Sequence, residues 1–406
     1  MLNWSMKTRG STMTPDKLVQ LATDNHEPEW FIQKRLQALK EMSELSLPKI
    51  QRFEYHNWDL LSDITKIIND TNKHDKNYIL TDIFAAMNEY PELVQKYLNQ
   101  VIKTNENQLM AYHTACLNHG IFLYVPKNTV VEEPIEVNLV QDSDQPFVSH
   151  ILIVAEENTQ FSFIQKMTTK GSKQSLANCI VEVVAKDNSI IKYAAVDELG
   201  ENVTSYLSRR ATVGNNAYVD WSIGLMNAGN TIADFDTDLR GEGSHSEIKV
   251  VDITTHRQQE GVNTRVTNYG KHSIGHINQR GVIMDRSRLI FNGIGHIIHG
   301  ASGANAEQQN RVLMMSGKAH GDANPILLID ENDVIAGHAA SVGQVDKQQL
   351  YYLMSRGIDE KTAQRMVIRG FLGDVLVSIP SKVIREQLVQ TIERKLENGQ
   401  QISENS

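Results

Sequence analysis

The chain has 406 residues, of which about 40% are apolar, and this is enough to build a sizeable buried core. Acidic residues outnumber basic ones by 49 to 40, and no Lys/Arg-rich block with interleaved aromatic residues occurs, so no nucleic-acid partner is expected. Neither a secretory leader nor a long apolar run is found, which predicts a cytoplasmic protein with no membrane span. The two cysteines, Cys116 and Cys179, are too few for a disulfide framework and are expected to be buried structural thiols.

Residues 1–120 are predicted to form an N-terminal helical region. The segment PEWFIQKRLQALKEM has apolar residues at helical spacing, which indicates an amphipathic helix. A later segment, NENQLMAYHTACLNHG, is expected to end its helix at Gly120, because glycine is favoured just after the last helical turn. The predicted apolar stripe of the first segment comprises Trp30, Leu36, Leu39 and Met42.

Residues 121–345 have the composition of a β region, with short runs of Val, Ile, Phe and Tyr between polar turns. Five turn markers are spaced at intervals of 30, 27, 28 and 28 residues. A period of this size predicts a flattened parallel β-helix in which each coil stacks on its neighbours, with a β-sandwich or a pair of barrels as the alternative. The helical flanks are expected to cap the terminal coils. The markers are Asn158, Asn188, Asn215, Gly243 and Lys271.

Helical patterning returns in residues 346–406. Asp346 is expected to cap a first helix, and Gly357 to separate it from a second helix that Asp359 opens. A break at Pro380 then precedes a third helix with one apolar face. The polar tail after Leu396 is predicted to be disordered.

Eight of the fourteen histidines lie between His245 and His338. Most of them are interpreted as ordinary surface or strand-ladder residues. His338 differs because small residues flank it where the β region ends, and small neighbours permit close approach of another chain. No phosphate-binding loop, zinc-hydrolase motif or serine-nucleophile motif is present, so no catalytic residue is predicted. The histidines given an ordinary role are His245, His256, His272, His276, His296 and His299.

The stretch NPILLIDENDVIAGHAASVGQVDKQQLYYLMSRGIDEKTAQRMVIRGFLGDVLVSIP resembles the shared C-terminal signature of the SufB/SufD family of the SUF iron-sulfur cluster assembly system. EPEWFIQKRLQAL and LYVPKNTVVEEPIEV resemble two earlier parts of that family. The resemblance implies a right-handed parallel β-helix between N-terminal and C-terminal helical regions. Asn310 stands where SufB has a cysteine, and Gly337-His338-Ala339 replaces its Glu-His-Glu triplet, so the chain is closer to the SufD branch.

The resemblance also implies a non-catalytic scaffold that pairs with a SufB-like paralogue and docks a SufC-like ATPase through residues 346–406. His338 becomes the candidate ligand for iron or a nascent cluster at the SufB interface. No cofactor is expected to stay bound to the isolated chain, with iron or an iron-sulfur cluster held transiently in the complex. Whether the isolated chain forms a homodimer is left open. The residues expected to contact the ATPase are Leu350, Tyr351, Leu353, Arg356, Gly357 and Phe371.

Three other interpretations are weighed. A SufB-type subunit would build a cluster itself, which Asn310 disfavours because an amide is a poor iron ligand. A β-helix polysaccharide lyase would need export and a groove of clustered acids and bases, and neither is visible in the sequence. An adhesin-like solenoid does not account for the elaborate helical C-terminal region.

Overall fold

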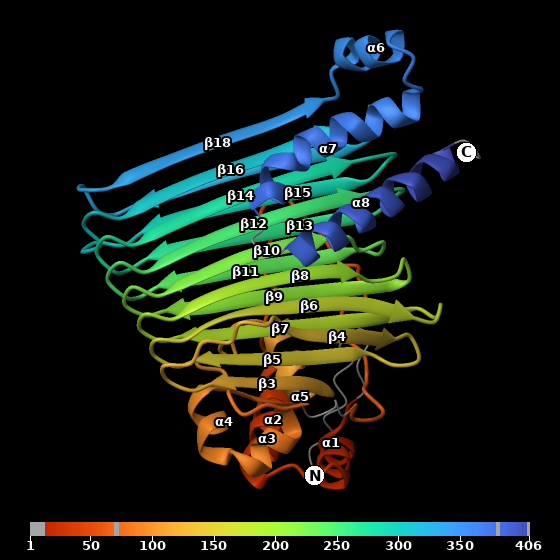
Figure 1. Ribbon diagram of the computed structural model, residues 1–406. Coiled ribbons are helices and arrows are strands. Elements are labelled where there is room, and N and C mark those ends of the chain that lie inside the picture. Colours follow the sequence, from red (N-terminus) through yellow and green to blue (C-terminus); the bar gives the residue numbers. More distant parts are fainter. Residues whose placement is uncertain (1–12, 69–72, 379–381, 404–406) are drawn as a thin grey trace.

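The computed structural model describes residues 13–68, 73–378 and 382–403. Two β-sheets face each other, and the chain passes from one to the other through short turns, so that each coil of the solenoid contributes one strand to each sheet (Figure 1). Every pairing between two strands of the solenoid, from the third strand to the last, is parallel. The predicted parallel β-solenoid between helical ends is confirmed.

The ten-stranded sheet holds the odd-numbered strands of the solenoid and, at its N-terminal end, two short strands that precede it. Its strands are β1 (Lys73–His74), β2 (Ile79–Asp82), β3 (His119–Val125), β5 (Phe147–Ala155), β7 (Ser175–Ala185), β9 (Val203–Val213), β11 (Thr231–Leu239), β13 (Gln259–Asn268), β15 (Arg288–Ile297) and β17 (His320–Ile329). The eight-stranded sheet comprises β4 (Ile135–Asp142), β6 (Gln160–Lys170), β8 (Ile190–Glu198), β10 (Tyr218–Leu225), β12 (His245–Thr254), β14 (Ile274–Ile283), β16 (Asn305–Met314) and β18 (Ile335–Gln344).

The turns between sheets repeat with the coil. Left-handed backbone is found at Asn158, Asn188 and Gly243, three of the five predicted markers, with φ of 58°, 58° and 65°. At the other two turns the left-handed residue is the next one along, Asn216 or His272. Asparagine and glycine tolerate this conformation at little steric cost, which is why the period was visible in the sequence.

Apolar side chains fill the space between the two sheets, and the largest of them stack from coil to coil. Tyr193 pairs in register with Phe163 on one side and Trp221 on the other, with ring centroids 5.5 and 4.7 Å apart. All three are almost fully buried. Aromatic pairs at such distances contribute about 0.5–1.5 kcal/mol each beyond the burial of their area.

The N-terminal helices cover the outer face of the ten-stranded sheet, and the second of them packs through a wider face than the predicted stripe. Met42 of that stripe is buried, and Trp30, Leu36 and Leu39 are half-buried against the neighbouring apolar clusters. The buried face also includes Arg35, whose guanidinium donates to Glu27 at 2.8 Å and to a backbone carbonyl at 2.6 Å. These helices are α1 (Pro15–Asp24), α2 (Glu29–Glu41), α3 (Ile83–Glu89), α4 (Pro91–Tyr97) and α5 (Gln108–Ala115).

Gly120 does not end a helix. Helix α5 is already capped at Cys116, and Gly120 is the second residue of β3. A Cβ atom at this position would lie 2.5 Å from Ile83 Cγ2 and 2.7 Å from the His150 carbonyl oxygen. The glycine is therefore required by close packing of α3 on the strand, and the predicted helix stop was wrong.

The C-terminal helices are α6 (Lys347–Ser355), α7 (Glu360–Ser378) and α8 (Lys382–Ser403). The Asp346 carboxylate accepts the Gln348 N–H at 2.8 Å, which confirms the predicted cap, and Gly357 has a φ of +89°. Helix α8 continues to Ser403, so the predicted disorder after Leu396 is wrong up to that residue; Pro380 and residues 404–406 lie outside the described residues. No helix in the described ranges has the length and apolar character needed to cross a bilayer.

Helices α7 and α8 lie across the outer face of the eight-stranded sheet (Figure 1). Their buried Leu372 and Leu388 join Val251 and Val282 of that sheet in one apolar cluster. They thus cover a face of the solenoid rather than its last coil, so the prediction that helices cap both ends is wrong for the C-terminal end. Their apolar stripes match the exposed apolar residues of the sheet face, which determines where they pack.

The two ends of the solenoid differ in how their strand edges are treated. At the N-terminal end, β2 pairs antiparallel with β3 and α3 packs beside it, whereas β4 of the eight-stranded sheet has a neighbouring strand, β6, on one side only. At the C-terminal end, β18 pairs with β16 and β17 with β15, and no further strand among the described residues pairs with either. Ile335 and Val342 of β18 stay 62% and 39% exposed. The C-terminal end therefore presents an open strand edge with apolar side chains.

Candidate functional site

The last coil carries the residue that the sequence singled out as an iron ligand. His338 pairs in register with Gln308 on β16, and Asn310 pairs with Ala340. Side chains alternate along a strand, so His338 lies on the same face as the inward-pointing Gln308 and Asn310. Asn310 is fully buried and its amide makes no hydrogen bond within the described part of the chain, whereas His338 is exposed because no coil covers it.

These positions define what the last coil can offer to a metal. An imidazole is a neutral ligand for iron, while an amide lacks the anionic charge of a thiolate. His338 alone could complete a site whose other ligands come from elsewhere, and it could not build one by itself. The structure thus brings His338 and Asn310 onto one face of adjacent strands, at the open end of the solenoid.

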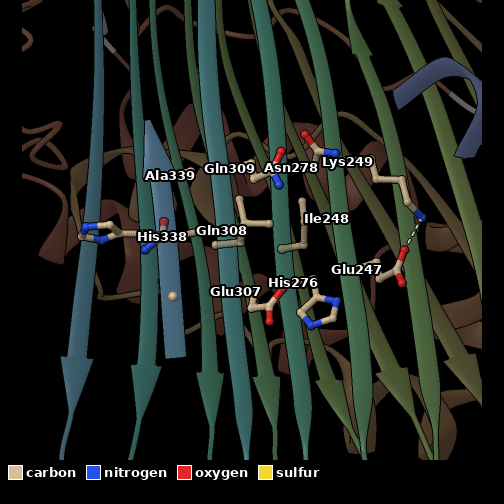
Figure 2. Close-up of a pocket in the computed structure, with 12 residues that line it drawn as sticks. Glu247, Ile248, Lys249, His276, Asn278, Glu307, Gln308, Gln309, His338 and Ala339 are labelled. Carbon is tan, nitrogen blue, oxygen red and sulfur yellow. Dashed lines mark ion pairs between the residues drawn. The ribbon is translucent and has the colours of Figure 1, made fainter. Parts of the chain in front are cut away.

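A shallow groove of about 380 Å³ crosses the opposite, outer face of the same sheet. Glu247, His276, Glu307 and Gly337 follow one another in register across β12, β14, β16 and β18, so three polar side chains form a row that leads to the open edge. Figure 2 shows the Glu307 carboxylate beside the His276 ring, and the His338 ring turned away from both. His338 also lines the groove, but its ring points away from this row of side chains.

Lys249 organises the charge at one end of the groove. Its Nζ lies 2.7 Å from Asp220 Oδ1. The same Nζ lies 2.7 Å from Glu247 Oε2, an ion pair that Figure 2 shows as a dashed line. Burial alone would raise the pKa of Glu247, but the hydrogen bond from Lys249 and its charge lower it overall. Burial lowers the pKa of His245 despite the attraction of Glu247. At neutral pH the Glu247 carboxylate is therefore ionised and lies beside the neutral imidazole of His245.

Sequence reasoning did not bring His245 and His276 together. Their separation of 31 residues equals the 29-residue step from His245 to its register partner Ile274 plus two residues along the strand. That arithmetic places both imidazoles on one face of adjacent strands. The pair could have been found by applying the repeat period to the histidine positions. That step requires the register between neighbouring strands of one sheet, and the turn markers give this register only to within one residue.

Four other central histidines have ordinary surroundings. His256 and His272 occupy left-handed turn positions, with φ of 58° and 55°. His296 Nε2 lies 3.1 Å from an Asp330 carboxylate oxygen, and His299, 87% exposed, has Glu331 at 3.7 Å. Each belongs to a turn or to a surface ion pair.

Both cysteines are buried, as predicted. Burial raises the pKa of the Cys116 thiol to about 12, and it raises that of Cys179 further. A thiol protonated at neutral pH is neither a nucleophile nor a metal ligand. Sulfur chemistry on this chain is therefore not supported by either residue.

The residues expected to bind an ATPase lie in two settings. Tyr351 on α6 is 74% exposed, and Leu350 and Leu353 of the same helix are half-buried. Arg356 and Gly357 are exposed in the connection that follows. Phe371 on α7 instead packs into the apolar cluster on the eight-stranded sheet, under the Arg280 guanidinium at 5.5 Å.

The sequence matches two family models. Residues 138–371 match the SUF system FeS cluster assembly SufBD core domain, and residues 62–137 match the SufBD protein N-terminal region. The core match alone covers more than half of the chain. The chain belongs to the SufBD family. Its core match runs from within β4 to Phe371 and so includes the groove, His338 and α6, and the polysaccharide-lyase and adhesin alternatives no longer apply.

Three SufBD relatives illustrate the range of similarity. The chain is 41% identical to the iron-sulfur cluster assembly protein SufD of Bacillus subtilis, over 96% of this chain and all of that protein. It is 28% identical to a SufBD family protein of Synechocystis, over 76% of this chain and 66% of the relative. A SufBD family protein of Staphylococcus saprophyticus is 24% identical over 75% and 66%. Similarity spans nearly the whole chain only with the protein named SufD among these three.

Proposed function

We propose that this protein is the SufD-type scaffold subunit of a cytoplasmic iron-sulfur cluster assembly complex, with a SufB-like paralogue and a SufC-like ATPase as partners. The open C-terminal end of the solenoid is the observation that carries the proposal, because an unpaired parallel edge with exposed apolar residues is suited to pairing with another solenoid. The 41% identity to a protein named SufD over 96% of the chain supports it.

In this proposal the β18 edge forms the seam with the SufB-like subunit. At the N-terminal end β2 pairs with β3, and only β4 is left as an edge strand of the solenoid, whereas both sheets end in solenoid edge strands, β17 and β18, at the C-terminal end, which makes that end the one suited to pairing. His338 faces the seam and contributes one imidazole to iron or a nascent cluster, the substrate of the assembly, while the partner supplies anionic ligands. Because Asn310 provides no thiolate, the isolated chain does not retain a cluster.

Helix α6 and the connection after it dock the ATPase, with Tyr351 at the centre of the contact. Since α7 follows this connection and packs on the eight-stranded sheet, a force applied to α6 is transmitted to the β-solenoid. ATP hydrolysis belongs to the partner, and this chain supplies a stiff frame. Phe371 stabilises the base of that contact through its packing beneath Arg280.

The proposal is tested by His338→Ala in the purified three-protein complex. We expect the complex to assemble as the wild type does and to hold less iron after reconstitution, because one ligand at the seam is removed. The matched control is His299→Ala, which removes an exposed histidine outside the last coil. Equal iron content of the His338→Ala and His299→Ala complexes would exclude His338 as a ligand.

A further inference from the structure

We propose that His245, Glu247 and His276 form a binding site for a divalent first-row transition metal ion on the outer face of the eight-stranded sheet. One ligand atom from each of the three residues lies within 4.8 Å of the other two. Ligand atoms about 2.1 Å from a common ion are at most about 4.2 Å apart, so small side-chain rotations close the site. Two imidazoles and one carboxylate are the donor set that Zn²⁺ and Fe²⁺ use in many proteins.

The strand geometry fixes these three side chains on one surface. His245 and Glu247 are two residues apart on β12 and so share a face, and Glu247 is the register partner of His276 on β14. The Tyr218 ring packs against His245 at 4.7 Å, which restricts the orientation of the imidazole. The site is therefore held by two neighbouring strands of a rigid sheet rather than by loops.

Two buried ring nitrogen atoms on this surface have free lone pairs or protons that a ligand could use. Nε2 of His245 and Nε2 of His276 are both shielded from solvent and make no hydrogen bond with any described residue. The nearest carboxylate oxygen to His245 Nε2 is Glu247 Oε1, at 3.7 Å, beyond hydrogen-bond distance. Buried polar atoms without a partner are costly, and a metal ion bound between the two rings would satisfy both.

The surroundings suit a cation. Lys249 holds Oε2 of Glu247 and leaves Oε1 directed at His245, as an outer-shell group does in metal sites. Asp220 compensates the charge of Lys249 at 2.7 Å. Glu307, the register partner of His276 on β16, is exposed in the groove and offers a further oxygen.

This site is independent of the proposed function, because it lies on the opposite face of the sheet from His338. It also departs from the expectation that the isolated chain retains no metal. Nitrogen ligands exclude Mg²⁺ and Ca²⁺, which prefer oxygen. The groove leads from the site to the open edge at β18, so an ion held here would be close to the last coil.

The test is calorimetric titration of the full-length, chelator-treated protein with Zn²⁺ and, without oxygen, with Fe²⁺. We expect one site per chain whose affinity falls at least tenfold in His276→Ala and in Glu247→Gln, which keeps the side-chain shape. The control is His299→Ala, whose His–Glu distance to Glu331 is also 3.7 Å but which lies outside the cluster. It should bind as the wild type does.

Three results would overturn the inference. They are the absence of saturable Zn²⁺ or Fe²⁺ binding, equal affinities of His276→Ala and His299→Ala, and Mg²⁺ binding as tight as that of Zn²⁺. His338→Ala separates the two proposals: it should lower iron loading of the complex and leave this titration unchanged. Loss of the site in His338→Ala would place the ion at the last coil instead and contradict the assignment.

Discussion

A buried ion pair inside the solenoid shows how single residues secure the stack. Arg209 Nη2 donates to both oxygens of Asp197 at 2.8 Å, and both side chains are almost fully buried. Asp197→Ala would leave an uncompensated buried guanidinium, so we expect the free energy of unfolding in urea to fall by about 3–5 kcal/mol. Asp144→Ala, which breaks an exposed pair with Lys173, should cause no measurable change. Similar losses in both variants would contradict this account.

Asp236 on β11 gives the protein a pH-dependent stability. Its side chain is only 21% exposed, and burial raises its pKa to about 7 although Arg210 opposes the shift. The folded state therefore prefers the protonated acid, a stabilisation that is complete below the unfolded pKa of about 4 and lost as pH rises through 7. Asp236→Asn should remove this loss. The measurement is the free energy of unfolding of the variant minus that of the wild type, and we expect this difference to increase by at least about 1 kcal/mol from pH 5 to pH 8. The same difference at both pH values would refute the raised pKa of Asp236.

At the residue scale, the sequence predicts what depends on local backbone and misses what depends on register. Asn158 and Asn188 were identifiable because asparagine tolerates left-handed backbone. Gly120 was misread because its packing partner, Ile83, is 37 residues away and its closeness is a tertiary feature. The proximity of His245 and His276 was missed for the same reason, because it depends on the register between two strands. An error of one residue in that register would put the two side chains on opposite faces of the sheet.

The packing of α8 on the solenoid depends on a close approach at Gly224 in β10. A Cβ atom there would lie 2.5 Å from Leu388 Cδ1. We expect Gly224→Ala to weaken the docking of α8 by about 1–3 kcal/mol, seen as faster hydrogen exchange in α8 while the strands keep their protection. The control is Gly337→Ala on β18 of the same sheet, where a Cβ atom would meet no heavy atom within 4 Å. If hydrogen exchange in α8 is as slow in Gly224→Ala as in the wild type, the docking of α8 does not depend on close packing against β10.

The elements themselves were predicted better than their positions. The apolar stripe of the third C-terminal helix was visible in its sequence, and Leu388, Ile392 and Leu396 are indeed buried. The surface that this stripe covers was not, because the outer face with Val251 and Val282 exists only once the coils have stacked. The C-terminal helices were therefore placed on the last coil in the prediction and lie on the sheet face in the structure.

The whole molecule is asymmetric along the solenoid axis, and the proposed pairing with a partner rests on that asymmetry. At the N-terminal end an antiparallel strand pairs with β3 and leaves β4 as an edge strand, whereas at the C-terminal end both sheets end in solenoid edge strands, β17 and β18. Natural proteins usually protect such edges, so an open one with exposed Ile335 and Val342 indicates a partner. The family resemblance could be recognised from the C-terminal motif, whereas the open edge required the structure.

The most direct test is the mass, by light scattering, of the protein mixed with its SufB-like paralogue. Val342→Lys places a charge on the open edge, and Val140→Lys places one at a similarly exposed position on β4, the strand at the other end of the same sheet. We predict that the wild type and Val140→Lys form a one-to-one heterodimer with the paralogue and that Val342→Lys does not. A heterodimer of unchanged affinity with Val342→Lys would contradict the assignment of the open end as the partner seam.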